Sequence, residues 1–308
     1  MFSRHILIIS AFILSSFLCA RASASTASDR QTAKWARHIE QTITALKPFT
    51  DADSLAAAGL LSLSKHSAQS LPLIEQAIAA APTRVDLIWL QIEVCLKVAT
   101  CDLAPIENHM GEVDPANAAG WVGTLVRASS SNDEDAKDAA LTVIGQKARF
   151  DIYWTALVSH LSDAITRTHK MSPEEALATV IGYQAAAPIP GYEAAAKACK
   201  GDRLQRAGVV EACRGVANAF QYGDNTLAEV IGITIAKRVW PEDSPEWKAA
   251  AEARRVYEYR SKLWLKLEIA DNTHMEQYLK LCRTSRREQD LWLAQIIAAG
   301  ENPNPPAD

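Results

Sequence analysis

A tryptophan that recurs about every 33 residues constrains the fold of this chain more than any other feature. Each of three short segments that follow a turn ends in a tryptophan, namely Trp89, Trp121 and Trp154. These tryptophans are spaced by 32 and 33 residues. Prolines in two of these turns, Pro82 and Pro115, are also 33 residues apart. This period is about the length of one helix–turn–helix unit. Because a single amphipathic helix pair cannot bury its apolar faces, neighbouring units stack, and we expect the tryptophans to lie in the shared core.

The rest of the chain has helical periodicity, and no stretch shows sustained alternation of apolar and polar residues. Ser172 with Glu175 and Thr226 with Glu229 have the spacing of capping boxes that open helices. The sequence therefore predicts an all-α fold: a helix-hairpin repeat array of the α-solenoid kind, with no significant β-sheet. Two prolines after residue 187 mark the expected boundary between halves. The predicted organisation is a signal peptide (1–24), an N-terminal repeat region (25–187), a C-terminal helical region (188–300) and a flexible tail (301–308).

The N-terminus has the form of a secretory signal peptide. The positively charged start Met1–His5 precedes a largely apolar run of 13 residues, Ile6–Leu18, which is too short to span a bilayer comfortably. Small residues then precede an expected cleavage after Ala24. An uncleaved membrane anchor is one alternative, and a lipid anchor at Cys19 is another, although bulky residues precede that cysteine. We expect an exported protein, periplasmic or, alternatively, secreted.

Charge and hydropathy restrict the partners of the mature chain. Cleavage removes Arg4 and Arg21, so the formal net charge goes from −4 to −6. An acidic protein is a poor candidate for nucleic acid, whose phosphates favour a basic face. The most apolar later stretch, Val85–Ala99, is interrupted by charged residues. We expect no integral membrane segment in the mature chain and no nucleic-acid partner.

Five cysteines remain after cleavage, and export favours disulfides. Cys95 and Cys101 bracket a helix end and a turn, while Cys199 and Cys213 bracket a polar link between two helices. Closeness in sequence favours these two local pairs, with Cys282 left over. Five cysteines allow fifteen ways of forming two bridges, so the other connectivities stay open.

The sequence contains no motif for catalysis or for a cofactor. Gly-x-Ser-x-Gly, His-Glu-x-x-His and the phosphate-binding Gly-x-x-x-x-Gly-Lys-Ser/Thr loop do not occur. We therefore name no catalytic residue, metal ligand or cofactor. His160 is interpreted as a core-edge histidine or, alternatively, a general base that needs a neighbouring acid. Glu93, in the most apolar helix, is a structural glutamate bonded to an arginine or an acid with a raised pKa.

The long helix expected from residue 247 to about 270 interleaves basic and aromatic residues. This pattern suits an acidic partner or an anionic glycan. Glutamates at helical spacings among them are equally typical of a solvated face with ion pairs. The candidate partner-binding surface consists of Arg254, Arg255, Tyr259, Arg260 and Trp264.

Residues 54–154 resemble the tetratricopeptide (TPR) helix-pair repeats. Ala77 takes the place of the small residue in the second helix of a unit, Pro82 closes that unit, and Pro115 lies close to the closing place of the next, before the unit that opens with Trp121. The first-helix signature Trp-Leu-Gly…Tyr is absent, and the spacing is 32–33 residues rather than about 34. The resemblance implies an α-solenoid with a groove that holds peptides or partner proteins, and it implies no catalytic residues.

The functional hypothesis is an exported scaffold that binds a protein or peptide partner in the cell envelope. The alternative is an all-α enzyme that acts on an envelope polymer through carboxylates, although no motif favours an enzyme. A groove lined with aromatic residues would support the first, and two facing carboxylates, one with a raised pKa, would support the second.

Overall fold

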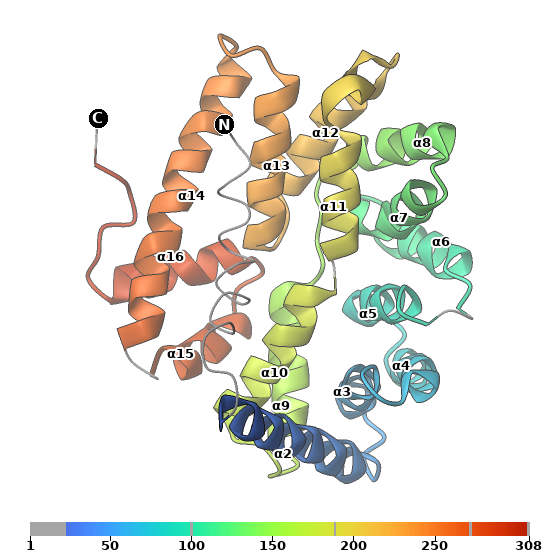
Figure 1. Cartoon of the computed structure of the whole chain (residues 1–308), viewed down its shortest axis with the longest axis vertical. Helices are drawn as coiled ribbons and strands as arrows, with labels where there is room; N and C mark the ends of the chain where they lie inside the picture. Colours follow the sequence, from blue (N-terminus) through green and yellow to red (C-terminus); the bar gives the residue numbers. More distant parts are fainter. Residues whose placement is uncertain (1–22, 99–100, 188, 271–272, 307–308) are drawn as a thin grey trace.

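A computed structural model describes residues 23–98, 101–187, 189–270 and 273–306 of the 308-residue chain. Within these ranges the regular secondary structure is helical, and the β-type pairing is limited to one isolated bridge between Asn117 and Arg149 (Figure 1). The predicted all-α fold is therefore confirmed. Of the predicted signal peptide, residues 1–22 lie outside the described ranges.

The helices follow one another with short connections. The first group is α2 (Ser23–Leu46), α3 (Ala52–Ser62), α4 (Ser67–Ala80), α5 (Val85–Cys95), α6 (Ala104–Val113), the 3-10 turn η2 (Ala118–Trp121), α7 (Val122–Ser130) and α8 (Glu134–Gly145). The second group is α9 (Trp154–Thr166), α10 (Pro173–Ala186), α11 (Ile189–Ala198), the 3-10 turn η3 (Gly201–Gln205), α12 (Val209–Gln221), α13 (Thr226–Val239), α14 (Pro245–Ala270), α15 (Thr273–Cys282) and α16 (Glu288–Ala298).

The N-terminal helices form three successive hairpins. Helix α3 packs on α4, α5 on α6 and α7 on α8, and the hairpins stack through contacts of α4 with α5 and of α6 with η2. Local residues fix the helix starts: Asp51 accepts a hydrogen bond from the main chain of α3, and Asp133 does the same for α8. The predicted array of helix pairs is thus confirmed.

The repeated tryptophans occupy different places in their units. Trp89 is fully buried within α5 and Trp154 is buried at the first position of α9, as expected of core residues. Trp121, at the end of η2, is only half-buried at the edge of the core. The recurring tryptophans therefore indicate the length of the repeat, but they do not occupy equivalent positions between the helices of successive units.

The chain returns across its own array after α8. The first helix of every hairpin meets a later helix: α3 and α5 pack against α9, and α7 packs against α11 (Figure 1). Helices α12, α13 and α14 continue the packing from α8, and α15 closes back onto α9 and α10. The face that the first helices form together is therefore covered by the chain's own helices, so the groove that the family resemblance implies is filled on this side.

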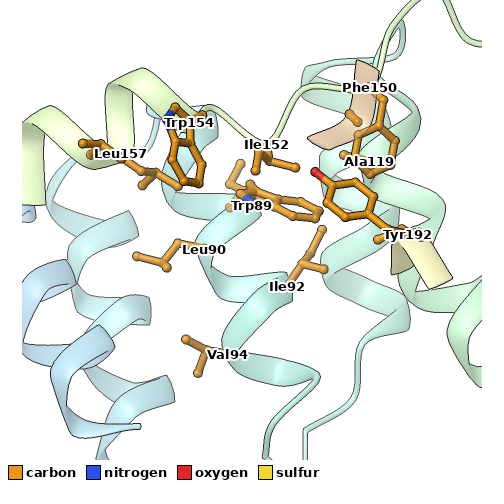
Figure 2. Close-up of a cluster of buried hydrophobic side chains, with 14 of the residues drawn as sticks. Trp89, Leu90, Ile92, Val94, Ala119, Phe150, Ile152, Trp154, Leu157 and Tyr192 are labelled. Carbon is orange, nitrogen blue, oxygen red and sulfur yellow. The ribbon is translucent and has the colours of Figure 1, made fainter. Parts of the chain in front are cut away.

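Phe150 lies near the centre of the core (Figure 2). Its ring centroid is 6.5 Å from that of Trp89 in α5, 5.6 Å from that of Tyr192 in α11 and 4.2 Å from that of Phe220 in α12. These rings come from both sides of the boundary predicted near residue 188. One aromatic cluster thus joins the N-terminal hairpins to the later helices.

Glycines allow α8 and α12 to approach each other at main-chain distance. A Cβ atom on Gly215 of α12 would lie 2.0 Å from the carbonyl oxygen of Gly145, the last residue of α8. No side chain can occupy that space without moving one of the helices. Glycine at 215 therefore permits the contact through which α12 continues the array.

Candidate functional site

Two disulfides fasten helix ends. Cys95 is bonded to Cys101 at the end of α5, with a Cα–Cα distance of 5.2 Å, and Cys199 is bonded to Cys213 between α11 and α12, with a Cα–Cα distance of 5.6 Å. These are the two pairs that closeness in sequence favours. Cys282 is buried and free, and burial raises the pKa of its thiol. Two disulfides are typical of a protein in an oxidising compartment.

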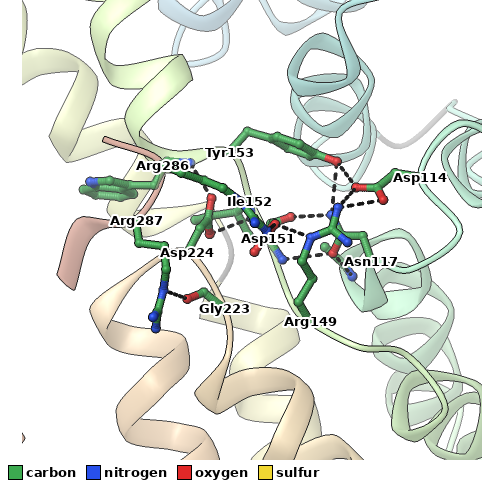
Figure 3. A network of polar contacts seen from close by, with 12 residues as sticks. Asp114, Asn117, Arg149, Asp151, Ile152, Tyr153, Gly223, Asp224, Arg286 and Arg287 are labelled. Atoms are coloured by element: carbon green, nitrogen blue, oxygen red, sulfur yellow. Dashed lines mark hydrogen bonds and ion pairs between the residues drawn. The ribbon is translucent and has the colours of Figure 1, made fainter. Parts of the chain in front are cut away.

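A cluster of polar side chains surrounds the non-helical segment 150–153, and we call it the polar junction: Asp114, Asn117, Arg149, Asp151, Tyr153, Asp224 and Arg286 (Figure 3). Arg149 donates to Asp151 at 2.5 Å and to both carboxylate oxygens of Asp114 at 2.7 Å. Arg286, from the loop before α16, also bonds Asp151, which is only 2% exposed. Two arginines therefore neutralise a buried aspartate whose charge would otherwise be costly.

The main chain of the same segment is held from two sides. The amide of Asn117 donates to the carbonyl of Asp151 at 2.8 Å and accepts from its N–H at 2.9 Å. The carboxylate of Asp224, in the α12–α13 turn, accepts from the N–H groups of Ile152 and Trp154, each at 2.9 Å. Tyr153 between them has a left-handed conformation, with φ at 56°. Such a conformation costs energy, and these bonds stabilise it.

Three buried carboxyl groups have raised pKa values. Burial raises the pKa of Glu93 to about 8 and, together with nearby Asp151, raises that of Asp224. Burial also raises the pKa of Glu288, which accepts two bonds from Thr226 at 2.8 Å. For Glu93 the raised pKa agrees with one of its two interpretations, and the arginine partner of the other is not what bonds it: the amide of Gln184 donates to it through Nε2 at 3.3 Å. The neighbouring carboxyls of Asp151 and Asp224 are both almost fully buried, and their bonds hold the fold together.

The arginine and aspartate of the polar junction have a counterpart 65 residues earlier in the chain, at the start of α5. Arg84 donates to Asp86 at 2.7 Å and to Asp53 at 3.0 Å, as Arg149 does to Asp151 and Asp114. The two sites share the sequence pattern Arg-x-Asp-x-x-Trp, at residues 84–89 and 149–154. The sequence analysis compared only the segments that run from aspartate to tryptophan. Each arginine lies two residues before its aspartate, so aligning slightly longer segments would have revealed both arginines.

His160 has the acidic neighbour that its alternative interpretation requires. Its Nδ1 lies 3.4 Å from Oδ2 of Asp53, and its side chain is 44% exposed, so it is a half-buried histidine with an acidic partner, which fits either interpretation. Hydrogen bonds with His160 and Arg84 outweigh burial and lower the pKa of Asp53 to about 2. An anionic Asp53 paired with both residues ties α3 to α9 and to the start of α5.

The five residues of the candidate partner-binding surface do not share one face of α14. Arg254 pairs with Glu258 of the same helix at 2.6 Å. The ring of Trp264 stacks on Trp292 of α16 with a centroid distance of 4.9 Å, and its indole N–H donates to Gln295 at 2.8 Å. Arg254 and Trp264 therefore serve contacts within α14 and between α14 and α16.

Two of the other three candidates, Arg255 and Arg260, bond the C-terminal segment that follows α16. Arg255 donates to the carbonyl of Pro306 at 2.8 Å, and Arg260 donates to that of Pro303 at 3.1 Å. Tyr259, between the two arginines in sequence, is half-buried. Figure 1 shows this segment running beside α14 at the outer edge of the molecule. The structure thus brings Arg255, Tyr259 and Arg260 together at one surface, which is already in contact with peptide main chain.

In comparisons with known proteins, no family model matches this chain, and no curated protein or solved structure is significantly similar to it. None of the helices in the described part of the chain combines the length and the apolar character that a membrane crossing requires. In the ranges that the structure describes, no three His, Cys, Asp or Glu side chains come together as a metal-binding group.

Proposed function

We propose that this protein is an exported helical-array scaffold, akin to the tetratricopeptide-type repeats, that binds a protein or peptide partner in the cell envelope through the outer face of α14. The signal-like N-terminus and the two disulfides support a periplasmic location. The partner surface lies outside the array because α9 and α11 cover the face that the first helices of the hairpins form.

The contact of α14 with peptide main chain is the observation that carries this proposal. In their contacts with the C-terminal segment, Arg255 and Arg260 donate to main-chain carbonyl oxygens and not to a side chain of that segment. Main-chain carbonyls are common to every peptide, so these donors supply affinity for an extended chain in general. A helix of 26 residues with charged side chains at most of its turns also suits a surface that contacts a partner.

The enzyme alternative required two carboxylates that face each other across a cleft. The pair that best fits its electrostatics, Asp151 and Asp224, is 2% and 1% exposed, and each is bonded to arginine or to main-chain N–H groups. No observation in the described residues favours this alternative over the scaffold.

In-cell crosslinking followed by affinity capture and mass spectrometry tests the proposed function. The tagged protein would be compared with a double variant, Arg255→Glu with Arg260→Glu, at native expression. Lys47→Glu with Lys65→Glu makes the same change in net charge at exposed positions at the far end of the array. We expect a reproducible envelope partner with the natural protein and the lysine variant, and its loss with the arginine variant. Recovery of the protein alone, or equal recovery of a partner with all three, would refute the proposal.

A further inference from the structure

Helix α14 carries two apolar stripes. Tyr257 and Trp264 form one with the neighbouring helix α16: both rings lie against Trp292, at centroid distances of 6.0 Å and 4.9 Å. Val256, Tyr259 and Leu263 recur at the i, i+3 and i+7 positions that share one face of a helix, and all three are half-buried. This second stripe lies about 120° around the helix axis from the first.

The two arginines flank the second stripe. At about 100° per residue, Arg255 and Arg260 lie about 70° to either side of its centre. A segment that is bonded to both must cross the stripe, and the segment that does so is the tail, residues 301–306. Pro303 and Pro305 are half-buried, while the asparagines that precede each of them are exposed. Pro303 and Pro305 therefore lie on the protein side of the tail, and its asparagine side chains lie toward solvent.

The tail runs antiparallel to α14 over a matching length. Arg255 contacts Pro306, Arg260 contacts Pro303, and the ammonium group of Lys266 lies 3.0 Å from the carboxylate of Glu301. Residues 255 to 266 of a helix span about 16 Å. Five extended peptide steps, from 301 to 306, also span about 16 Å. The three basic residues are thus spaced to hold an extended segment of this length.

The contacts select a particular kind of peptide. Glu252 accepts two bonds from Arg255, both at 2.8 Å, and so orients the guanidinium group toward the tail. Proline fixes φ and lowers the entropy that an extended segment loses on binding. Lys266 favours a carboxylate at the N-terminal end of the segment.

We propose that the outer face of α14 is a binding site for an extended, proline-containing peptide segment with an acidic residue at its N-terminal end, and that the chain's own tail occupies this site until such a partner displaces it. This inference rests on the proposed function, and it names the chemistry of the partner. A tethered tail competes at an effective concentration of about a millimolar or more, so a partner must bind more tightly than the free tail sequence does.

Fluorescence anisotropy with a labelled peptide of residues 301–308 (Glu-Asn-Pro-Asn-Pro-Pro-Ala-Asp) tests the site directly. The protein would be the full disulfide-bonded chain with residues 301–308 replaced by a Gly-Ser sequence of equal length, and circular dichroism would verify its fold. We expect this tail-replaced protein to bind the peptide at least about tenfold more tightly than the natural chain. A peptide with alanine at its three prolines should bind at least about tenfold more weakly.

Substitutions in the tail-replaced protein locate the site. Arg255→Ala with Arg260→Ala should weaken peptide binding at least about tenfold, whereas Lys248→Ala, at an exposed position of the same helix, should leave it unchanged. No binding by the folded tail-replaced protein, or equal binding by the arginine variant, would overturn the inference. A natural chain that forms a dimer through residues 301–306, measured by light scattering, would overturn occupancy by its own tail.

The two proposals fail in distinguishable ways. Capture of an arginine-dependent partner in cells, combined with no binding of the peptide, would leave the proposed function in place and overturn this inference about partner chemistry. Peptide binding combined with no captured partner would establish the site on α14 and refute the proposed role in the cell envelope.

Discussion

Replacing Glu93 with glutamine should remove a pH dependence that this buried carboxyl imposes on folding. Glu93 is 2% exposed within α5, and burial raises its pKa from 4.5 to about 8. A carboxyl with a raised pKa binds its proton more tightly in the folded than in the unfolded protein. Its contribution to the free energy of unfolding is therefore greatest below about pH 4.5 and decreases as the pH rises toward about 8.

The size of this effect follows from the same pKa values. An unfolded-state pKa of 4.5 and a folded-state pKa of about 8 imply a loss of about 3 kcal/mol between about pH 5 and about pH 8. Glutamine has nearly the same shape, carries no charge and keeps an oxygen that can accept from Gln184. Glu93→Gln should therefore match the natural protein at about pH 5 and exceed its free energy of unfolding by about 3 kcal/mol at about pH 8.

Urea denaturation followed by circular dichroism, with the disulfides intact, measures this difference across the pH range. Asp224, whose pKa is also raised, is present in both proteins, and because its charge contributes to the raised pKa of Glu93, the difference between the curves reports Glu93 together with that interaction. Glu75→Gln, at an exposed position of α4, removes one carboxyl and reports the effect of the charge change alone. Parallel pH curves for the Glu93 variant and the natural protein would refute the reasoning.

Four further variants test the packing of the array by the same denaturation assay. Arg149→Met should cost about 3–5 kcal/mol, because it removes one of two arginines from the buried aspartate of the polar junction; a cost below about 1 kcal/mol would contradict that role. Gly215→Ala should cost about 3 kcal/mol, because its Cβ would meet the main chain of α8. Gly182→Ala, where a Cβ meets nothing within 4 Å, should instead stabilise α10 by about 0.5–1 kcal/mol, and equal effects would exclude the close-contact explanation. Replacing Cys199 and Cys213 by serine should cost about 3 kcal/mol for a sequence separation of 14 residues, and an unchanged urea midpoint would contradict this.

Helix starts show how far local sequence reasoning reached. Ser172 and Glu175 form the predicted capping box at the start of α10, because every group involved lies within one turn. The second predicted box is wrong by one residue: Asn225 caps α13, and Thr226 is the first helical residue. The carboxylate of Glu288, 62 residues away, accepts hydrogen bonds from the N–H and the hydroxyl of Thr226. The cap itself is local, because the side chain of Asn225 accepts from the N–H of Ala228, whereas the bonds of Thr226 to a distant carboxylate could not be predicted from local spacing.

The candidate surface on α14 likewise shows what local sequence patterns predict and what depends on residues distant in the chain. Periodicity placed Arg255 and Arg260 on a long charged helix, but it could not distinguish a solvated face from a binding face. That distinction depends on which part of the chain packs against the helix face. Here it is the tail, which bonds Arg260 from 43 residues and Arg255 from 51 residues further along the chain. For Trp264 the opposite surface is Trp292, so an aromatic residue that suited a partner contact became part of a helix interface.

The sequence by itself determined the helices, the hairpin repeat and the two local disulfides, because each depends on residues within about one repeat of one another. Only the tertiary structure decided that α9 and α11 cover the array and that Asp151, Asp224 and Arg286 meet around the segment 150–153. These contacts join residues 70 to 135 positions apart. Nothing in a local pattern specifies such a pairing, because the free energy that favours it comes from burying both partners together.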